Sequence, residues 1–312
     1  MTALPAQTLA AAKVNLGLFL GPPREDGKHE IVSVMQSVSL ADELVLELAG
    51  EPAGSDEVIC PGVDGPSELN LAARALKLFR EATGWDAPPL RLRIQKRIPV
   101  AAGLGGGSAD AAGALRLAAH VSGLGSELLA ELAVDLGADV PAAITPGRWL
   151  ASGSGEHLRA LPEPHSPLGV LIAPAVGGLS TAAVYEQADR MALARERHEL
   201  AGVHDALEHA LGAGAWLPAA ELLVNDLQPA ALALHGEIAK RLELLTRTGA
   251  DAVFLSGSGP TVVGLYAGES GPQRAAGVAG ALAAHMPPPL ACATVGARFA
   301  HITRVGASQL GG

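Results

Sequence analysis

The residues with the clearest chemical potential form a glycine-rich loop that leads into a helix-like stretch. Positions 96 to 115 read KRIPVAAGLGGGSADAAGAL. Glycines let a backbone approach a ligand closely and turn through positive φ angles. Ser108, a favoured N-cap, and Asp110 in the first turn would open a helix whose N-terminus presents free N–H groups and a positive dipole end to phosphate. A glycine-rich hairpin or linker is the alternative interpretation.

Two common phosphate-binding loops do not match this segment. A P-loop has Lys followed by Ser or Thr directly after its last glycine, whereas Gly107 is followed by Ser108 and Ala109. A dinucleotide-binding fingerprint has Gly or Ala at its sixth position. Counting from Gly103 or Gly105 places Ser108 or Asp110 there. If the loop binds a nucleotide, a phosphate-binding or catalytic lysine must therefore come from elsewhere in the chain.

Length and composition indicate a well-buried globular protein. The chain has 312 residues, 49% of them hydrophobic, and a mean hydropathy of +0.28, which is enough for two packed cores. We find no run of about eighteen apolar residues, and strand-like sequence begins within about eight residues of the start. We therefore expect a cytoplasmic protein without a membrane partner.

Charge and cysteine content narrow the function classes further. The net charge of −10 argues against a nucleic-acid partner. One basic cluster fits a solvated strand face as well as a polyanion site; it comprises Arg91, Arg93, Lys96 and Arg97. The two cysteines, Cys60 and Cys292, are far apart, and the ten histidines lack ligand-like spacing, so structural zinc is not expected.

Hydrophobic patterns place these motifs on an alternation of sheets and helices. Positions 8–20 alternate as a strand around Lys13, Asn15 and Gly17, and positions 31–48 read as two further strand-like runs. Helical spacing covers 69–83 and 128–136, and strand patterns cover 90–98 and a hairpin at 149–158.

A proline-rich stretch at 161–167 is the best candidate linker, so we divide the chain into domains at 1–161 and 168–312. The second part reads as a strand at 169–173, a helix capped by Ser180 or Thr181, helices over 189–220, two strands within 252–266, a helix and a last strand near 293–299. This order predicts a small α+β sandwich.

Three separated stretches, taken together, resemble the GHMP small-molecule kinases, which include galactokinase, homoserine kinase and mevalonate kinase. They read AKVNL, PVAAGLGGGSADAA and LSGSGPTV, and the resemblance covers nearly the whole chain. The triple glycine before Ser108, the REDGKH segment and GADVP are similar to the branch that acts on a cytidine-diphosphate-linked methylerythritol in the non-mevalonate isoprenoid pathway. Mevalonate and homoserine kinases usually show GLGSSAA instead.

The resemblance implies a two-domain α+β fold. The N-terminal domain would be like domain 2 of ribosomal protein S5, with a left-handed β-α-β unit, and the C-terminal domain would be a ferredoxin-like α/β sandwich. ATP and substrate would meet between them. The γ-phosphoryl of ATP would pass to the 2-hydroxyl of the methylerythritol unit, giving the 2-phosphate and ADP. Mg²⁺ would be carried with the nucleotide, and no tightly bound organic cofactor is expected.

The resemblance also implies residue roles. Asp139 in GADVP would accept the hydroxyl proton, or orient the alcohol without taking its proton early, and Lys13 beside it would polarise the alcohol. Asn70 and Lys96 would hold the nucleoside, although a helix-start asparagine and a solvated strand lysine are the alternatives. Backbone N–H groups of the loop would bind the ATP phosphates, with the Ser108 hydroxyl near the phosphates or Mg²⁺. The loop residues are Gly103, Leu104, Gly105, Gly106, Gly107 and Ser108.

For the cytidine end, the resemblance implies His29 and Tyr185, with Asn15 and Thr181 lining the substrate pocket. This chain departs from the family pattern, because Lys28 stands where relatives often have an aromatic residue. We therefore expect one-sided stacking of cytosine on Tyr185. Lys28 would reach a phosphate or cover the base with its stem or charge.

Three further interpretations remain open from the sequence. Another GHMP kinase of the mevalonate or homoserine type is the enzyme alternative, and DGKH and GGGS weigh against it. A regulator on the same fold without catalysis is the second, against which both Lys13 and Asp139 argue. The third concerns assembly: a monomer or a weak homodimer that takes a small-molecule substrate is expected.

Overall fold

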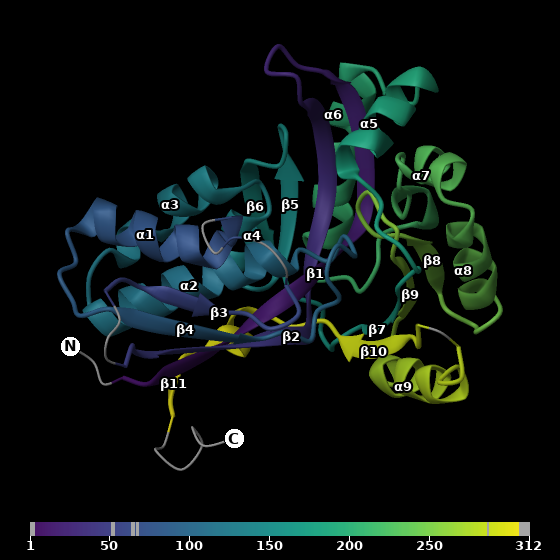
Figure 1. Cartoon of the computed structure of the whole chain (residues 1–312). Helices are drawn as coiled ribbons and strands as arrows, with labels where there is room; N and C mark the ends of the chain where they lie inside the picture. The colour runs from purple at the N-terminus through teal and green to yellow at the C-terminus, as the bar shows by residue number, and fades with distance from the viewer. Residues whose placement is uncertain (1–3, 51–53, 64–65, 67–68, 286, 306–312) are drawn as a thin grey trace.

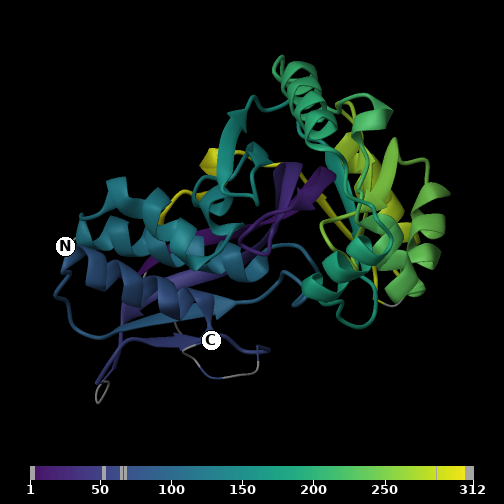
Figure 2. The same cartoon turned by 90° about the horizontal axis from the view of Figure 1, so that it is seen from above.

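The computed structural model describes residues 4–50, 54–63, 66, 69–285 and 287–305. Two β-sheets, each with its own helices, lie side by side (Figures 1 and 2). The first sheet comes mainly from the first half of the chain and the second sheet from the second half. The residues of interest lie where the two meet.

The first sheet has the strand order β11-β1-β2-β4-β3, and a β5–β6 hairpin continues it from β2. Two long antiparallel strands, β1 and β2, form its centre. Register shifts occur between Ala11 and Lys13 and between Asn15 and Gly17, where bulges bend the strand and re-aim its side chains. The strands are β1 (Ala6–Pro23), β2 (His29–Leu48), β3 (Glu57–Ile59), β4 (Leu90–Gln95), β5 (Arg148–Ser152), β6 (His157–Leu161) and β11 (Thr303–Arg304).

Helices α1 to α4 gather on one side of this sheet (Figure 1). They are α1 (Leu71–Thr83), α2 (Gly106–Ser122), α3 (Leu129–Leu136) and α4 (Val140–Ile144), with a 3₁₀ turn, η2 (Ser126–Leu128), before α3. The alanine-rich α2 is buried along most of its length. It can approach the sheet closely because a Cβ at Gly113 would lie only 2.7 Å from Cδ2 of Leu44. This close packing fixes the position of the helix that follows the glycine loop.

The second sheet is antiparallel with the order β10-β7-β9-β8. Its strands are β7 (Gly169–Ala173), β8 (Ala252–Leu255), β9 (Val262–Tyr266) and β10 (Leu290–Ala293). In chain order this is a 4-1-3-2 arrangement, as a ferredoxin-like sandwich requires. The second half of the chain also contains the helices α5 (Thr181–Arg190), α6 (Arg197–Leu211), α7 (Gln228–Leu234), α8 (Glu237–Thr246) and α9 (Gly271–Ala281), with 3₁₀ turns η3 (Ala220–Leu222) and η4 (Ala297–Ala300). Of these, α8 and α9 pack on the second sheet, whereas α6 packs on β1, β2 and β5 of the first sheet and η4 on β1.

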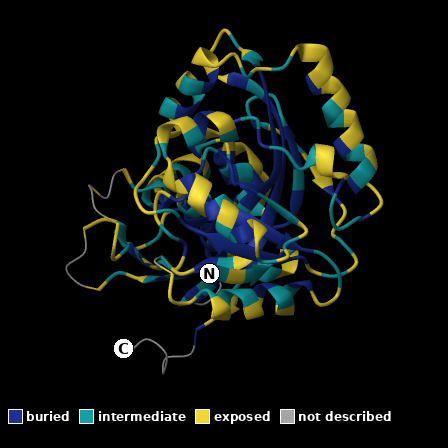
Figure 3. Cartoon of the chain, turned by 90° about the vertical axis from the view of Figure 1, so that its right-hand side faces the viewer, coloured by how far each residue is buried: buried dark blue, intermediate teal, exposed yellow. Residues whose placement is uncertain are grey.

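Burial follows the layers. The central strands β1, β2, β7 and β9 are mostly buried, and the outward helix faces are exposed (Figure 3). One large core cluster extends from beneath α1 and α2 to Val170, Ile172 and Phe254 of the second sheet, so apolar packing continues across the two sheets. A second cluster lies on the other face of the second sheet, against α5, α7 and α8.

Most predicted elements are confirmed, including the hairpin near 149–158 and the strand at 169–173. Three were wrong. Positions 31–48 form one continuous strand, because β2 pairs with β1, β4 and β5 along its length. Positions 189–220 hold only the end of α5 and then α6. The last strand of the second sheet ends at Ala293, and η4 follows it.

The predicted β-α-β unit is present as the parallel pair β3 and β4, joined by α1; the hand of its crossover stays a prediction. The domain limits 1–161 and 168–312 remain our proposal, and their outer ends lie outside the described residues. Strand β11, close to the C-terminal end of the described chain, pairs with β1 of the first sheet. The C-terminal segment therefore ties the two halves together.

Candidate active site

Lys13 and Asp139 face each other across the first sheet and its helices. Lys13 lies on β1 just after a bulge, and its Nζ is 3.4 Å from Oδ2 of Asp139. The same Nζ donates a hydrogen bond of 2.8 Å to Oδ1 of Asn15. The Lys13 side chain is 18% exposed and that of Asp139 is 32% exposed, so the pair is accessible to a ligand. These contacts give an ammonium and a carboxylate that a substrate hydroxyl can reach together.

Asp139 is placed by a sharp change of chain direction. Helix α3 ends before Gly137, and Asp139 occupies the N-cap position of the short helix α4, which has a proline in its first turn. Proline suits the start of a helix because its missing N–H would have no partner there. The sequence GADVP therefore presents the carboxylate at a helix start, facing Lys13.

The glycine loop is built tightly around Lys13 and needs its glycines. Gly103 and Gly105 have φ angles of 73° and 71°. A Cβ at Gly105 would lie 3.0 Å from Cγ of Lys13. The backbone N–H of Lys13 donates to the carbonyl of Leu104 at 3.0 Å. The loop and strand β1 are thus in direct contact.

Helix α2 begins at Gly106, three residues earlier than a Ser108 N-cap would give. Gly105 takes the N-cap position with a left-handed backbone and makes no side-chain cap bond. The expectation for Ser108 as N-cap was wrong, and Asp110 lies in the second turn rather than the first. The first N–H groups of a helix have no intrahelical partner. Without a side-chain cap they are available to an anion at this loop.

The turn after β8 supports the loop from the second sheet. A Cβ at Gly103 would lie 2.7 Å from the carbonyl oxygen of Gly259, and the backbone N–H of Asn15 donates to Ser256 Oγ at 3.3 Å. Asn225, for which sequence analysis gave no role, donates to the carbonyls of Leu255 and Gly257, each at 2.7 Å. The one signal at this position in the sequence is that Asn225 and Asp226 shortly precede a helix, α7.

Lys96 is not the solvated strand lysine that one interpretation suggested. Its Nζ donates to Oδ2 of Asp42 at 2.5 Å and to Oδ2 of Asp110 at 2.7 Å, and its side chain is 12% exposed. Burial raises the pKa of Asp110 to about 7, against the opposing effect of the Lys96 ammonium. Asn70 is the N-cap of α1, since its Oδ1 accepts from the N–H of Ala72 at 2.9 Å.

The predicted cytidine-end residues lie together around one hairpin tip and one helix. The rings of His29 and Tyr185 have centroids 5.3 Å apart and are tilted by 45°. His29 is buried, and its Nε2 lies 2.8 Å from Oδ1 of Asp189, which sequence analysis missed. Burial, together with the negative charge of Asp139, raises the pKa of Tyr185 to about 12. Lys28 is exposed.

The other two predicted pocket residues make protein contacts. Asn15 is buried, with its Nδ2 donating to Ser33 Oγ at 2.7 Å. The hydroxyls of Thr181 and Ser258 are 2.9 Å apart, and Thr181 is exposed. Asn15 thus orients Lys13, and Thr181 joins α5 to the supporting turn.

The arginines of the basic cluster, on and just after β4, are paired with glutamates. Arg91 pairs with Glu57 at 2.5 Å, Arg93 with Glu47 at 2.7 Å, and Arg97 with Glu43 at 3.0 Å. These ion pairs favour the solvated strand face over a polyanion site.

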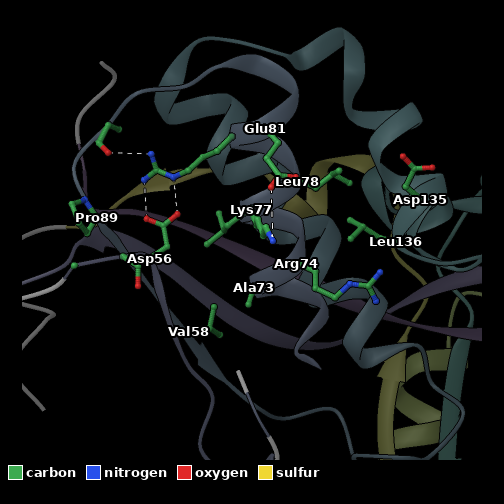
Figure 4. Close-up of a pocket in the computed structure, with 15 residues that line it drawn as sticks. Asp56, Val58, Ala73, Arg74, Lys77, Leu78, Glu81, Pro89, Asp135 and Leu136 are labelled. Carbon is green, nitrogen blue, oxygen red and sulfur yellow. Dashed lines mark hydrogen bonds and ion pairs between the residues drawn. The ribbon is translucent and has the colours of Figure 1, made fainter. Parts of the chain in front are cut away.

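A larger cavity is lined by residues other than Lys13 and Asp139. A groove of about 1020 Å³ runs over the outer face of α1, between the Asp56–Arg80 ion pair and Leu136 (Figure 4). A much smaller cavity of about 10 Å³ is lined by Lys13, Gly105 and Asp139. The candidate active site is the small cavity, because the paired lysine and carboxylate line it. The volume of a cavity does not by itself indicate a reaction.

Comparison with known proteins decides which chemistry this geometry serves. Residues 70–147 match the GHMP kinases N terminal domain, and residues 193–287 match the GHMP kinases C terminal family. The 4-diphosphocytidyl-2-C-methyl-D-erythritol kinase of Salinispora tropica is 39% identical over 286 residues, which cover 89% of each chain. That of Anaeromyxobacter is 40% identical over 276 residues, covering 86% of this chain and 83% of its own.

The chain belongs to the 4-diphosphocytidyl-2-C-methyl-D-erythritol kinase family. A crystal structure of a 4-(cytidine 5′-diphospho)-2C-methyl-D-erythritol kinase has 32% identity and a TM-score of 0.73, covering 92% of this chain and 98% of its own. The homoserine kinase of Cytophaga hutchinsonii, at 16% identity and a TM-score of 0.71 over 97% of this chain and 98% of its own, shares the fold alone. The GHMP kinase fold and family predicted from sequence are confirmed.

Two observations bear on metals and membranes. Among the described residues, no group of three or more His, Cys, Asp or Glu side chains is arranged to hold a metal ion. Within the same ranges, no helix combines the length and apolar character needed to span a bilayer.

Proposed function

We propose that this enzyme transfers the γ-phosphoryl group of ATP to the 2-hydroxyl of 4-diphosphocytidyl-2-C-methyl-D-erythritol, releasing ADP and the 2-phosphate. The observation that carries the proposal is the Lys13–Asp139 pair, 3.4 Å apart and in contact with a glycine loop at a helix start. Sequence identity of about 40% to 4-diphosphocytidyl-2-C-methyl-D-erythritol kinases, over most of the chain, supports the choice of acceptor.

In the proposed reaction, Asp139 accepts the proton of the 2-hydroxyl as its oxygen bonds to the γ-phosphorus and the bond to the ADP oxygen breaks. Lys13, next to Asp139, polarises the same hydroxyl and offsets negative charge on the transferring group. Asn15 holds Lys13 by the bond to Nζ. Positioning and electrostatic stabilisation supply most of the catalysis in such transfers.

The glycine loop is our proposed ATP phosphate site. Its backbone N–H groups at the start of α2 would bind the phosphates, with Ser108 in the first turn beside them. Mg²⁺, carried by the phosphates, would neutralise their charge. A nucleoside contact stays a prediction for Asn70, the N-cap of α1, whereas Nζ of Lys96 is already bonded to Asp42 and Asp110.

His29 and Tyr185 form our proposed cytosine site. Tyr185 offers one ring face for stacking, and Asp189 fixes the orientation of the His29 ring. Lys28, exposed at the hairpin tip, is the candidate for covering the base or reaching a phosphate. Thr181 and Asn15 would border the remainder of the substrate. We place the reaction in the cytoplasm, on a monomer or weak homodimer.

The test is ADP release with ATP, Mg²⁺ and one acceptor at a time. Turnover with the cytidine-diphosphate-linked acceptor, and none with mevalonate or homoserine, is expected. Turnover with mevalonate or homoserine but not with the cytidine compound would reject the proposed acceptor. Release of no ADP with any of these would favour a regulator.

A further inference from the structure

A buried ion cluster lies beneath the glycine loop, separate from the Lys13–Asp139 pair. It consists of Asp42 on β2, Lys96 after β4 and Asp110 in α2. The Asp42 side chain is 0% exposed and that of Asp110 is 6% exposed. Two carboxylates therefore share a single ammonium in a place that water hardly reaches.

Each member holds a different part of the frame around the loop. Oδ1 of Asp42 accepts the backbone N–H groups of Arg97 and Ile98, at 2.6 and 2.9 Å, which fixes the segment entering the loop. Asp110 belongs to the helix that leaves the loop. Lys96 bonds to both carboxylates. Its ammonium therefore links the segment that enters the loop to the helix that leaves it.

The loop itself packs on this ammonium. A Cβ at Gly106, the first residue of α2, would lie 3.3 Å from Nζ of Lys96 and 3.1 Å from Cγ2 of Ile98. The backbone that offers its N–H groups to phosphate thus rests directly on the cluster. A shift of Nζ would move the start of α2.

A direct nucleoside contact would withdraw Lys96 from partners that need it. Removing one partner of a buried ion pair leaves an uncompensated buried charge, which is strongly destabilising. The cluster is already short of donors, because Oδ1 of Asp110 has no hydrogen-bond partner in the structure. Burial raises the pKa of Asp110 to about 7, although the Lys96 ammonium acts to lower it.

We propose that Lys96 is a positioning residue of the donor site, which acts through Asp42 and Asp110 to hold the glycine loop in its phosphate-binding shape. It is not a contact that recognises the nucleoside. This inference rests on the proposed function, because it takes the loop as the site of the ATP phosphates.

The test compares ATP with inorganic tripolyphosphate, which has the phosphates but no nucleoside. Binding of each is measured by calorimetry to the full chain without acceptor, for wild type and Lys96→Met. The expected result is an equal weakening of both ligands, by about tenfold to a hundredfold, since small misplacements of a site cost this much. Weaker ATP binding with unchanged tripolyphosphate binding would overturn the proposal, as would no change for either ligand.

Three further variants protect the test against a fold defect. Lys77→Met removes an exposed lysine from α1, 78% exposed, and should leave both affinities unchanged. Adding Asp110→Asn to Lys96→Met removes one of the two opposed carboxylates and should restore part of the affinity for both ligands; absence of any restoration would count against the cluster. If Lys96→Met does not fold, Lys96→Arg, which keeps the charge but moves the donors, should weaken both ligands equally, and unequal weakening would reject the idea.

The proposed function and the positioning role of Lys96 can be rejected separately. If wild type binds both phosphate ligands but transfers nothing to the cytidine-linked acceptor, the proposed function is wrong, while the binding comparison still decides the role of Lys96. If turnover is normal and the two ligands respond differently to Lys96→Met, only the positioning role is wrong.

Discussion

The donor half of the candidate site consists mainly of backbone groups, whereas the acceptor half consists of side chains. On the donor side, backbone groups of the glycine loop are fixed by buried contacts with Lys13, Gly259 and the Asp42–Lys96–Asp110 cluster. On the acceptor side, side chains at a hairpin tip and on α5 form the surface, and two of them, Lys28 and Thr181, are exposed. The donor side should therefore tolerate almost no change, whereas the acceptor side should respond gradually to substitution.

The largest effect is expected at the carboxylate between the two halves. Asp139→Asn keeps the side-chain shape but cannot accept the hydroxyl proton, so kcat should fall by about 10³-fold. ATP binding, measured by calorimetry, should stay within about twofold, a change worth less than 1 kcal/mol. Asp135→Asn, on the exposed face of α3, is the matched control and should keep full activity. A kcat close to wild type in Asp139→Asn would remove this residue from the chemistry.

Replacing a glycine by alanine should lower activity in the tightly packed glycine loop but not at a glycine that lies in open space. Gly105→Ala places a Cβ 3.0 Å from Cγ of Lys13, and the resulting displacement should lower kcat about a hundredfold. Gly123 has the same φ angle of 71° but meets no atom within 4 Å. Gly123→Ala should therefore lose about 1 kcal/mol of stability and keep its activity. Equal kinetic effects in the two variants would contradict a close-packed loop.

The acceptor side should be open to improvement. Lys28→Tyr supplies a second ring face for cytosine opposite Tyr185. Because stacking of one base contributes about 1 to 3 kcal/mol, KM for the acceptor should fall at least fivefold. Tyr185→Leu should raise KM by a similar factor with a smaller change in kcat. Steady-state kinetics at saturating ATP measure both. An unchanged KM in Lys28→Tyr would show that the second face is already filled by another group.

The smallest effect concerns the hairpin tip that carries the acceptor residues. Arg24 bonds to Glu156 at 2.6 Å, and Ser154 Oγ bonds to Glu156 at 2.8 Å. Burial acts to raise the pKa of Glu156, but the hydrogen bonds from Arg24 and Ser154 lower it to about 2. Because this folded-state pKa lies below the usual 4.5, the stabilisation is present above pH 4.5 and is lost as pH falls through 2.

Glu156→Gln should therefore reduce the free energy of unfolding at pH 7 by less than about 1 kcal/mol, as exposed ion pairs do. The difference from wild type should fade between pH 4.5 and 2 in urea titrations. Glu25→Gln, an exposed glutamate in the same turn, serves as control. A difference that stays constant with pH would show that charge is not its cause.

The residues proposed for the donor side could be chosen from the sequence, whereas the contacts that hold them could not. Glycine spacing and the family motifs pointed to the loop, Lys13 and Asp139, which the structure brings together, and their roles stay predictions. The cluster was missed, since Asp42 lies in a strand-like run and meets Lys96 only when β2 and β4 pair. The start of α2 was misplaced because serine is normally the better N-cap, whereas here the left-handed backbone at position 105 favours glycine.

The central claim, transfer to a tertiary hydroxyl at the Lys13–Asp139 pair, is tested most directly by ³¹P NMR of the product. A phosphate on carbon 2 has no hydrogen on the carbon that bears it, so its new ester resonance should lack three-bond coupling to a proton. ADP should appear in equal amount, and both signals should be nearly absent with Asp139→Asn. An ester resonance split by carbon-bound protons would place the phosphate on another hydroxyl and contradict the account.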